Sequence, residues 1–140
     1  MSLYLDTSVI IPLILPDALV GRAEQFRATA RDVLIVSDYA GVEFSSVVGR
    51  RVRTRELSGE DGTKVLEVFD LWRDRRARRA QIEPDDIVRA ETHVRAFSLT
   101  LRGPDAIHIA IAQRLGATLV TFDRRMATAA RMLGLAVAGA

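Results

Sequence analysis

Short apolar runs alternate with segments of helical periodicity along this chain, and this alternation limits the folds that it can adopt. Strands that alternate with helices form parallel sheets, and such sheets carry helices on both faces. The pattern predicts an α/β fold with a parallel central sheet. The expected strands span 3–5, 33–36, 81–82, 118–121 and 135–137, and the expected helices span 7–14, 18–31, 38–54, 84–97, 104–115 and 124–133. A further long helix is expected to start at 58 and to run into the arginines of 73–79.

Residues with capping or helix-ending preferences mark several of these boundaries. Ser37 stands where an N-cap is expected, and Ser58 begins a loose capping box. Pro84 suits the first turn of a helix, and Gly116 suits the residue that ends one. The sequence contains no internal repeat, low-complexity segment or linker. We therefore expect its 140 residues to form a single domain over 1–140.

The composition excludes several kinds of site. The chain has no cysteine, so it lacks disulfides, thiolate metal ligands and a cysteine nucleophile. Its two histidines are too few for a zinc site with several histidine ligands. Charged residues interrupt the apolar stretches, and the first residues lack the basic start of a signal peptide, so we expect a soluble cytoplasmic protein with no membrane contact. Any bound metal ion would be held mainly by oxygen.

Four acidic residues stand where an expected strand ends or an expected helix begins. Asp6 follows the first strand, Asp123 follows the fourth, Asp105 opens a helix, and Glu43 lies in the early turns of another. In an open parallel sheet, ligands bind beyond the carboxyl ends of the strands, so these side chains are expected to meet there. Clustered carboxylates repel one another and gain affinity for a hard cation such as Mg²⁺ or Mn²⁺. The four acids are therefore candidate metal ligands and catalytic residues for phosphodiester hydrolysis.

Each acid, taken alone, also has a structural interpretation. Asp105 and Asp123 suit helix caps, Asp6 suits a turn, and Glu43 suits an exposed helix surface. It is their joint placement that favours a shared site. Asp38 fits a cap position and is kept as a peripheral candidate.

Two hydroxyls and one histidine accompany these acids. Ser8 and Thr121 each lie two residues from an acid, so either could share its side of the strand end and position a metal-bound water. A local backbone hydrogen bond is an equally good interpretation for each hydroxyl. His108 lies about one turn after Asp105 and is flanked by isoleucines, which predicts a packed, supporting histidine.

The basic residues are almost all arginine and are unevenly distributed. Of the 20 basic residues, only Lys64 is a lysine. Arginine binds phosphate through two hydrogen bonds and stacks on bases, so a dense group of arginines is a candidate for RNA contact. An exposed helix surface is the alternative interpretation. The densest group comprises Arg73, Arg75, Arg76, Arg78 and Arg79.

Four sequence segments together resemble the PIN domain family. They are Leu-Asp-Thr-Ser near the N-terminus, Val-Glu-Phe-Ser-Ser-Val-Val around Glu43, Pro-Asp-Ala-Ile-His-Ile-Ala around Asp105, and Leu-Gly-Ala-Thr-Leu-Val-Thr-Phe-Asp ending at Asp123. Within that family the chain is similar to the VapC toxins of bacterial toxin-antitoxin pairs. The resemblance spans nearly the whole chain, and the segment from Asp105 to Asp123 is its most specific part.

The resemblance implies a three-layer α/β/α fold with a parallel sheet of about five strands. It also implies an endoribonuclease that requires Mg²⁺ or Mn²⁺ and cuts structured RNA such as transfer or ribosomal RNA. Asp6, Glu43, Asp105 and Asp123 match the acidic quartet of the family, and Ser8 matches its accessory hydroxyl. The implied partners are a VapB-like antitoxin, whose C-terminal segment reaches the active site, and a second copy of the chain in a homodimer. No acid follows Asp123 within its helix, so a second metal site would have fewer ligands, and one-metal and two-metal mechanisms both stay open.

Three alternative functions make different demands on the sequence. A response-regulator phosphoacceptor domain needs a lysine after a late strand, whereas the only lysine is Lys64. A haloacid-dehalogenase-like phosphatase needs an aspartate where this chain has Ser8. A non-catalytic RNA-binding or partner-binding protein of the same fold would bind RNA with strong salt dependence and without metal. Converging carboxylates favour the nuclease, since a protein that only binds phosphate gains nothing from them.

Overall fold

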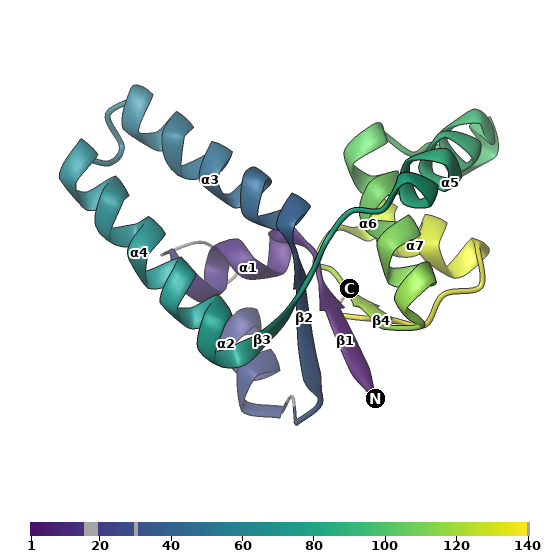
Figure 1. The fold of residues 1–140 in the computed structure, drawn as a ribbon, viewed down its shortest axis with the longest axis horizontal. Coiled ribbons are helices and arrows are strands. Elements are labelled where there is room, and N and C mark those ends of the chain that lie inside the picture. The colour runs from purple at the N-terminus through teal and green to yellow at the C-terminus, as the bar shows by residue number, and fades with distance from the viewer. Residues whose placement is uncertain (16–19, 30, 140) are drawn as a thin grey trace.

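The computed structural model describes residues 1–15, 20–29 and 31–139, which form a five-stranded sheet between two groups of helices (Figure 1). Every strand pairing is parallel, and the order across the sheet is β3-β2-β1-β4-β5. The predicted α/β fold with a parallel central sheet is confirmed. The strands are β1 (Ser2–Leu5), β2 (Val33–Ser37), β3 (Ala77–Ala80), β4 (Thr118–Val120) and β5 (Val137–Ala138).

Alternate side chains of the strands face opposite layers of helices. Leu5 and Val36 join one core with α1, α3 and α4, whereas Tyr4 and Ile35 join a second core with α6 and α7. The three-layer α/β/α arrangement follows from these two cores (Figure 1). The first layer contains α1 (Thr7–Ile14), α2 (Val20–Thr29), α3 (Asp38–Arg53) and α4 (Gly59–Arg76), and the second contains α5 (Pro84–Arg95), the short 3-10 helix η1 (Phe97–Leu99), α6 (Gly103–Leu115) and α7 (Arg124–Met132).

Capping residues at the carboxyl ends of three strands begin the next helices. Asp6 caps α1, Ser37 caps α3, and Asp123 caps α7, each through its side-chain oxygen. The strand ends and the helix starts therefore meet at one edge of the sheet. At the opposite end of α6, Gly116 has a φ of 60°, which is the left-handed conformation expected of a helix-ending glycine.

The strand predicted at 81–82 is wrong, because the third strand is β3, four residues earlier. Helix α4 ends at Arg76, and Ala77 is already extended, with φ −133° and ψ 149°. Arg78 and Arg79 are exposed on this edge strand, which pairs with β2 alone. Exposed charges on an edge strand hinder its pairing with other chains, and they hide the apolar alternation by which strands are recognised.

The other predicted elements exist, with boundaries shifted by a few residues. The helix expected over 84–97 ends at Arg95 and is followed by η1. Of the helix expected over 18–31, residues 18, 19 and 30 lie outside the described residues, and the rest contains α2. None of the helices described is long and apolar enough to cross a bilayer.

Candidate active site

A cavity of about 120 Å³ lies at the edge of the sheet where β1 and β4 end. All four predicted acids line it, although they come from four separate parts of the chain. Asp6 and Asp123 stand at strand ends, whereas Glu43 and Asp105 project from the early turns of α3 and α6. The complete lining consists of Asp6, Thr7, Ser8, Glu43, Asp105, His108, Asp123 and Met126.

Asp6 is held at the floor of this cavity by hydrogen bonds to both carboxylate oxygens. Its side chain is buried. Oδ1 accepts from Ser8 Oγ at 2.6 Å and from the Val9 N–H at 3.3 Å, and Oδ2 accepts from Thr121 Oγ1 at 2.7 Å. Burial raises the pKa of Asp6, and the charge of His108 and the hydrogen bonds from Ser8 and Thr121 oppose that rise.

The two hydroxyls that bond to Asp6 also fix the segment after β4. Ser8 Oγ accepts a hydrogen bond from the Phe122 N–H at 2.9 Å, and Thr121 Oγ1 accepts one from the Asp123 N–H at 3.0 Å. Each hydroxyl thus donates to a carboxylate and accepts from the backbone. These bonds support a role in holding Asp6, and the positioning of a water by either hydroxyl stays a prediction.

Glu43 is oriented by Thr7 and His108, which both bond to its Oε1. Thr7 Oγ1 donates to Oε1 at 2.7 Å, and His108 Nε2 contacts the same oxygen. Burial alone would raise the pKa of Glu43, but the hydrogen bond and charge of His108, together with the Thr7 bond, lower it overall. Oε2 has no hydrogen bond within the described residues, so it is available to the cavity.

A buried chain of hydrogen bonds continues from Glu43 across the sheet. His108 Nδ1 lies 2.7 Å from Tyr4 Oη, and Tyr4 Oη lies 2.7 Å from Ser37 Oγ, which caps α3. Burial raises the pKa of Tyr4 far above its usual value, so its hydroxyl stays protonated. The interpretation of His108 as a packed, supporting residue agrees with these contacts.

Asp105 and Asp123 form the other side of the cavity. Asp105 Oδ2 lies 3.6 Å from Arg102 Nε, and its side chain is 14% exposed. Burial raises the pKa of Asp105, Arg102 opposes that rise, and the nearby charge of Asp123 adds to it. Asp123 Oδ1 accepts from the backbone N–H groups of Arg125 and Met126 at 2.8 and 3.1 Å. Asp123 is therefore the helix cap that its position predicts. The cap interpretation of Asp105 is wrong, because Arg102 occupies the N-cap position of α6 and Asp105 lies in the first turn of the helix.

The donors around the cavity suit a hard divalent cation. They are carboxylate and hydroxyl oxygens, which Mg²⁺ and Mn²⁺ prefer. Both ring nitrogens of His108 are occupied by Tyr4 and Glu43, and His93, which does not line the cavity, bonds through Nε2 to Gln113 at 2.8 Å. As the side chains stand, no three acidic or histidine residues of the described chain are close enough together to hold an ion. Their role as metal ligands stays a prediction.

Two of the five arginines predicted to contact RNA are paired with carboxylates in the structure. Arg73 packs over the Phe69 ring, 4.9 Å from its centroid, and bonds to Asp70 at 3.1 Å. Arg79 forms an ion pair with Asp38 at 2.8 Å. Asp38, the peripheral candidate, does not line the active-site cavity. RNA contact by this group stays a prediction. The exposed members without such pairs among the described residues are Arg75, Arg76 and Arg78.

Sequence reasoning missed several residues that shape the cavity. Thr7 directly follows Asp6, and this adjacency is the one signal that could have identified it. Tyr4 lies inside an apolar strand, so its hydroxyl contact to His108 depends on how the sheet and α6 pack. Arg102 approaches Asp105 only because both lie at the start of α6.

Comparison with known proteins agrees with this geometry. The family model of the PIN domain matches residues 3–132. Ribonuclease VapC3 of Pyrobaculum aerophilum is 28% identical over 131 residues, which cover 91% of this chain and 93% of that protein. Ribonuclease VapC46 of Mycobacterium tuberculosis is 35% identical over 106 residues, which cover 66% of this chain and 82% of that protein.

Solved structures share the fold at lower identity. The crystal structure of VapC20 from Mycobacterium tuberculosis, described as a sarcin-ricin loop cleaving toxin, has a TM-score of 0.74 at 22% identity. The match covers 91% of this chain and 94% of VapC20. FitAB bound to a DNA fragment has a TM-score of 0.76 at 17% identity, with 97% of this chain and 93% of the other covered. From its sequence match and its three-layer fold, we conclude that this chain belongs to the PIN domain family and resembles the VapC ribonucleases.

Proposed function

We propose that this chain is an endoribonuclease that requires Mg²⁺ or Mn²⁺ and acts in the cytoplasm as the toxin of a toxin-antitoxin pair. The observation that carries the proposal is the single cavity lined by four carboxylates from four parts of the chain. The relatives named ribonuclease VapC3 and VapC46 support RNA as the substrate. A fold relative described as cleaving the sarcin-ricin loop supports a structured RNA, such as ribosomal or transfer RNA.

Asp6, Glu43, Asp105 and Asp123 would hold the divalent ion, with small side-chain movements that bring their oxygens together. When bound, such an ion supplies an activated water and polarises a phosphodiester oxygen. Thr7 and His108 both bond to Oε1 of Glu43. Oε2 has no hydrogen bond within the described residues, so it is the oxygen of Glu43 that would bind the ion. One-metal and two-metal mechanisms are both compatible with these residues.

The chain contributes to hydrolysis mainly by fixing its carboxylates before the substrate arrives. Ser8 and Thr121 hold Asp6 from two sides, and the backbone at the start of α7 holds one oxygen of Asp123. Thr7 and His108 do the same for Glu43. Groups that are held in place need little reorganisation during the reaction, which is where most electrostatic catalysis originates.

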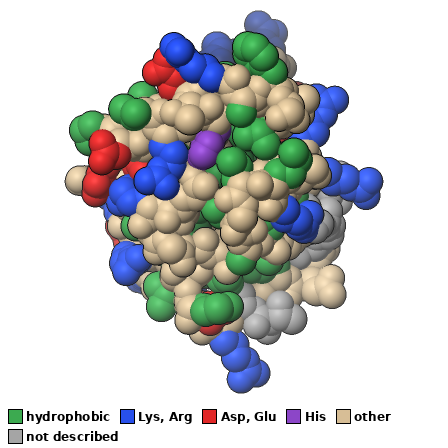
Figure 2. Space-filling view, turned by 90° about the vertical axis from the view of Figure 1, so that its right-hand side faces the viewer, with side chains coloured by type: hydrophobic (Ala, Val, Ile, Leu, Met, Phe, Trp, Pro, Cys, Tyr) green, Lys and Arg blue, Asp and Glu red, His purple; other side chains and the backbone are tan. Residues whose placement is uncertain are grey.

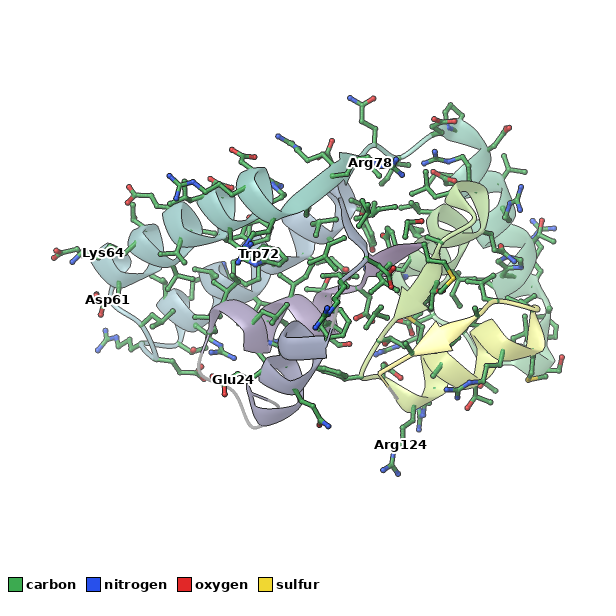
Figure 3. The ribbon with its side chains drawn as sticks, turned by 90° about the horizontal axis from the view of Figure 1, so that it is seen from below. Glu24, Asp61, Lys64, Trp72, Arg78 and Arg124 are labelled. Carbon is green, nitrogen blue, oxygen red and sulfur yellow. The ribbon has the colours of Figure 1, made fainter. Side chains whose placement is uncertain are left out.

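An antitoxin is proposed to bind at a second crevice of about 210 Å³ between α1, α2, β2 and α4. Trp72 points from α4 into the body of the molecule near this crevice (Figure 3). An amphipathic VapB-like segment would match the mixture of apolar and charged side chains there. The lining consists of Leu13, Phe26, Arg31, Asp32, Leu34, Trp72 and Arg76.

A homodimer is also proposed. Apolar side chains on the outer surface of α5 are exposed, with Ile87 at 46% and Val88 at 64%. Ile87 also lines a cavity of about 340 Å³ between α5 and α6, together with Val94 and Ile107. Burial of this surface in a second copy would remove apolar area from water.

The function is tested with purified protein and total RNA from the host, with Mg²⁺ or Mn²⁺ present. We expect discrete cuts, mapped as new 5′ ends by sequencing. Asp105→Asn should abolish them while the circular dichroism spectrum and melting temperature show a folded protein. Asp61→Asn is the matched control, because Asp61 is exposed at the start of α4, far from the cavity (Figure 3). Equal cutting by Asp105→Asn and wild type would remove Asp105 from the mechanism, and RNA binding without cuts would support the non-catalytic alternative.

A further inference from the structure

A groove of about 240 Å³ lies beside the candidate active site, between η1 and α7. Its lining residues are close in sequence to residues that line the active-site cavity. Thr100, on one wall, precedes Asp105 by five residues, and Arg124, on the other, directly follows Asp123. We call it the α7 groove. It is lined by Ser98, Leu99, Thr100, Arg124, Arg125, Thr128 and Met132.

The two arginines of the α7 groove are available to a ligand. Both Arg124 and Arg125 are exposed, and neither side chain has an ion pair or hydrogen bond within the described residues. Arg124 projects from the surface on the side of the molecule opposite Arg78 (Figure 3). The groove contains no acidic side chain, in contrast to the carboxylates that engage Arg73 and Arg79. Free arginines without competing carboxylates favour an anionic ligand.

An exposed aromatic ring adjoins this groove. Phe97 is 88% exposed and directly precedes Ser98. Exposed rings of this kind serve as stacking platforms for unpaired bases. Figure 2 shows the side of the molecule on which α5, α6 and α7 lie in Figure 1; basic side chains are spread among apolar ones there, and acidic side chains are fewer. Phosphate-binding groups and a stacking surface together match single-stranded nucleic acid.

The position of the groove relative to the catalytic cavity indicates which part of the RNA would bind in it. Asp123, the N-cap of α7, and Met126 of α7 line the catalytic cavity, whereas Arg124, Arg125 and Thr128 of the same helix line the groove. These two sets project from different sides of one helix, so the sites are separated by roughly the helix diameter of 10–12 Å. A groove smaller than the about 300–1,000 Å³ typical of sites for whole small molecules suits one unit of a longer chain.

We propose that the α7 groove and Phe97 bind the single-stranded RNA segment next to the cleaved bond. Arg124 and Arg125 contact its phosphates, and Phe97 stacks on one of its bases. The hydroxyls of Ser98 and Thr100 lie where they can bond to ribose. This inference rests on the proposed ribonuclease function and specifies how that site receives its substrate.

The phosphate contacts are tested by binding a short fluorescent single-stranded RNA to the Asp105→Asn protein at several salt concentrations. Adding Arg124→Gln and Arg125→Gln should weaken binding and lower the salt slope by about 1.4, since each phosphate contact in single strands contributes about 0.7. The charge-matched control replaces Arg50 and Arg53, which are exposed at the far end of α3, with Gln. An unchanged slope in the α7 variant, or an equal fall in the control, would overturn the assignment.

The stacking contact is tested with three variants of Phe97. We expect Phe97→Leu and Phe97→Ala to weaken binding of the same RNA by about fivefold or more, and Phe97→Tyr to restore it, because only the aromatic variants stack. Leu keeps most of the apolar area, so it separates stacking from hydrophobic contact. The molar mass of each variant is measured by light scattering. Equal binding by Leu and Phe, or a change in mass that accounts for the loss, would refute a base contact.

The location next to the cleaved bond is tested by crosslinking. Because the chain has no cysteine, Thr128→Cys would be the single site for a thiol-reactive photocrosslinker. We expect crosslinks in the host RNA within a few nucleotides of the mapped cut, and none there from Ser46→Cys on the exposed surface of α3. Crosslinks spread evenly over the RNA would overturn the location. Wild-type protein that cuts no RNA would instead count against the proposed function itself, whatever the variants bind.

Discussion

Replacing Thr121 with valine removes one hydroxyl from the candidate active site and keeps the shape of the side chain. The side chain of Thr121 is fully buried. Its Oγ1 donates to Asp6 Oδ2 at 2.7 Å and accepts from the Asp123 N–H at 3.0 Å. The variant would therefore leave Asp6 with the donors Ser8 and Val9 alone, and it would leave the Asp123 N–H without its acceptor.

The size of the effect follows from these two bonds. A hydrogen bond to a charged group contributes about 1.5–3 kcal/mol, and a buried group left without its partner costs a similar amount. We expect Thr121→Val to lower the free energy of unfolding by about 1.5–3 kcal/mol. For a domain of this size, that change lowers the melting temperature by about 6–12 °C. The lost donor had stabilised the charged form of Asp6, so its removal raises the pKa of Asp6 further.

The assay combines denaturant unfolding with a pH profile of RNA cleavage. Thr118→Val is the matched control. Thr118 is the first residue of β4, three residues before Thr121, and its side chain has no hydrogen bond within the described structure. We expect the control to change stability by less than about 0.5 kcal/mol. The acid limb of the cleavage profile should move to higher pH in Thr121→Val alone. Equal stability of the two variants, with superimposable pH profiles, would refute the role assigned to this hydroxyl.

Three further predictions test other parts of the structure. Millimolar Mg²⁺ should raise the melting temperature of the wild type, because it binds only the folded carboxylate cluster, and it should have little effect on Asp105→Asn; no shift in the wild type would count against a metal site. Arg114 forms an ion pair with the buried Asp86 at 2.9 Å and, against the opposing effect of burial, lowers its pKa. This pair therefore stabilises the fold at pH values above about 4, and its contribution is lost as the pH falls further. Arg114→Gln should cost about 3–5 kcal/mol at neutral pH and less near pH 3, and a cost independent of pH would contradict the pairing. A variant that replaces Arg75, Arg76, Arg78 and Arg79 removes the charges of the arginine group, and this should flatten the salt slope of RNA binding. An unchanged slope would show that these arginines are ordinary surface residues.

The sequence predicts the sheet and the acidic cavity because both depend on local signals. Apolar runs, capping residues and acids at strand ends are visible in the chain itself, and parallel strands bring their carboxyl ends to one edge. Asp6 and Asp123 are clear cases, since each is both a helix cap and a cavity residue. For these positions, the cap and the functional interpretation do not compete.

The parts that sequence reasoning missed depend on contacts between distant elements. The bond from His108 to Tyr4 joins α6 to β1, and neither residue signals the other. The sequence predicts the third strand too late in the chain, because Arg78 and Arg79 interrupt the apolar pattern of an edge strand that forms by pairing with β2. The α7 groove likewise needs η1 and α7 to come together, although the two segments are separated by the whole of α6.

The most direct test of the account is the rate of RNA cleavage as a function of Mn²⁺ concentration, measured on the RNA identified by end mapping. The account predicts a rate that rises to saturation with Mn²⁺, falls to background in EDTA, and stays at background at every concentration for Asp105→Asn. Cleavage that persists at its full rate in EDTA, or that Asp105→Asn supports as well as the wild type, would contradict a metal site built from these four carboxylates.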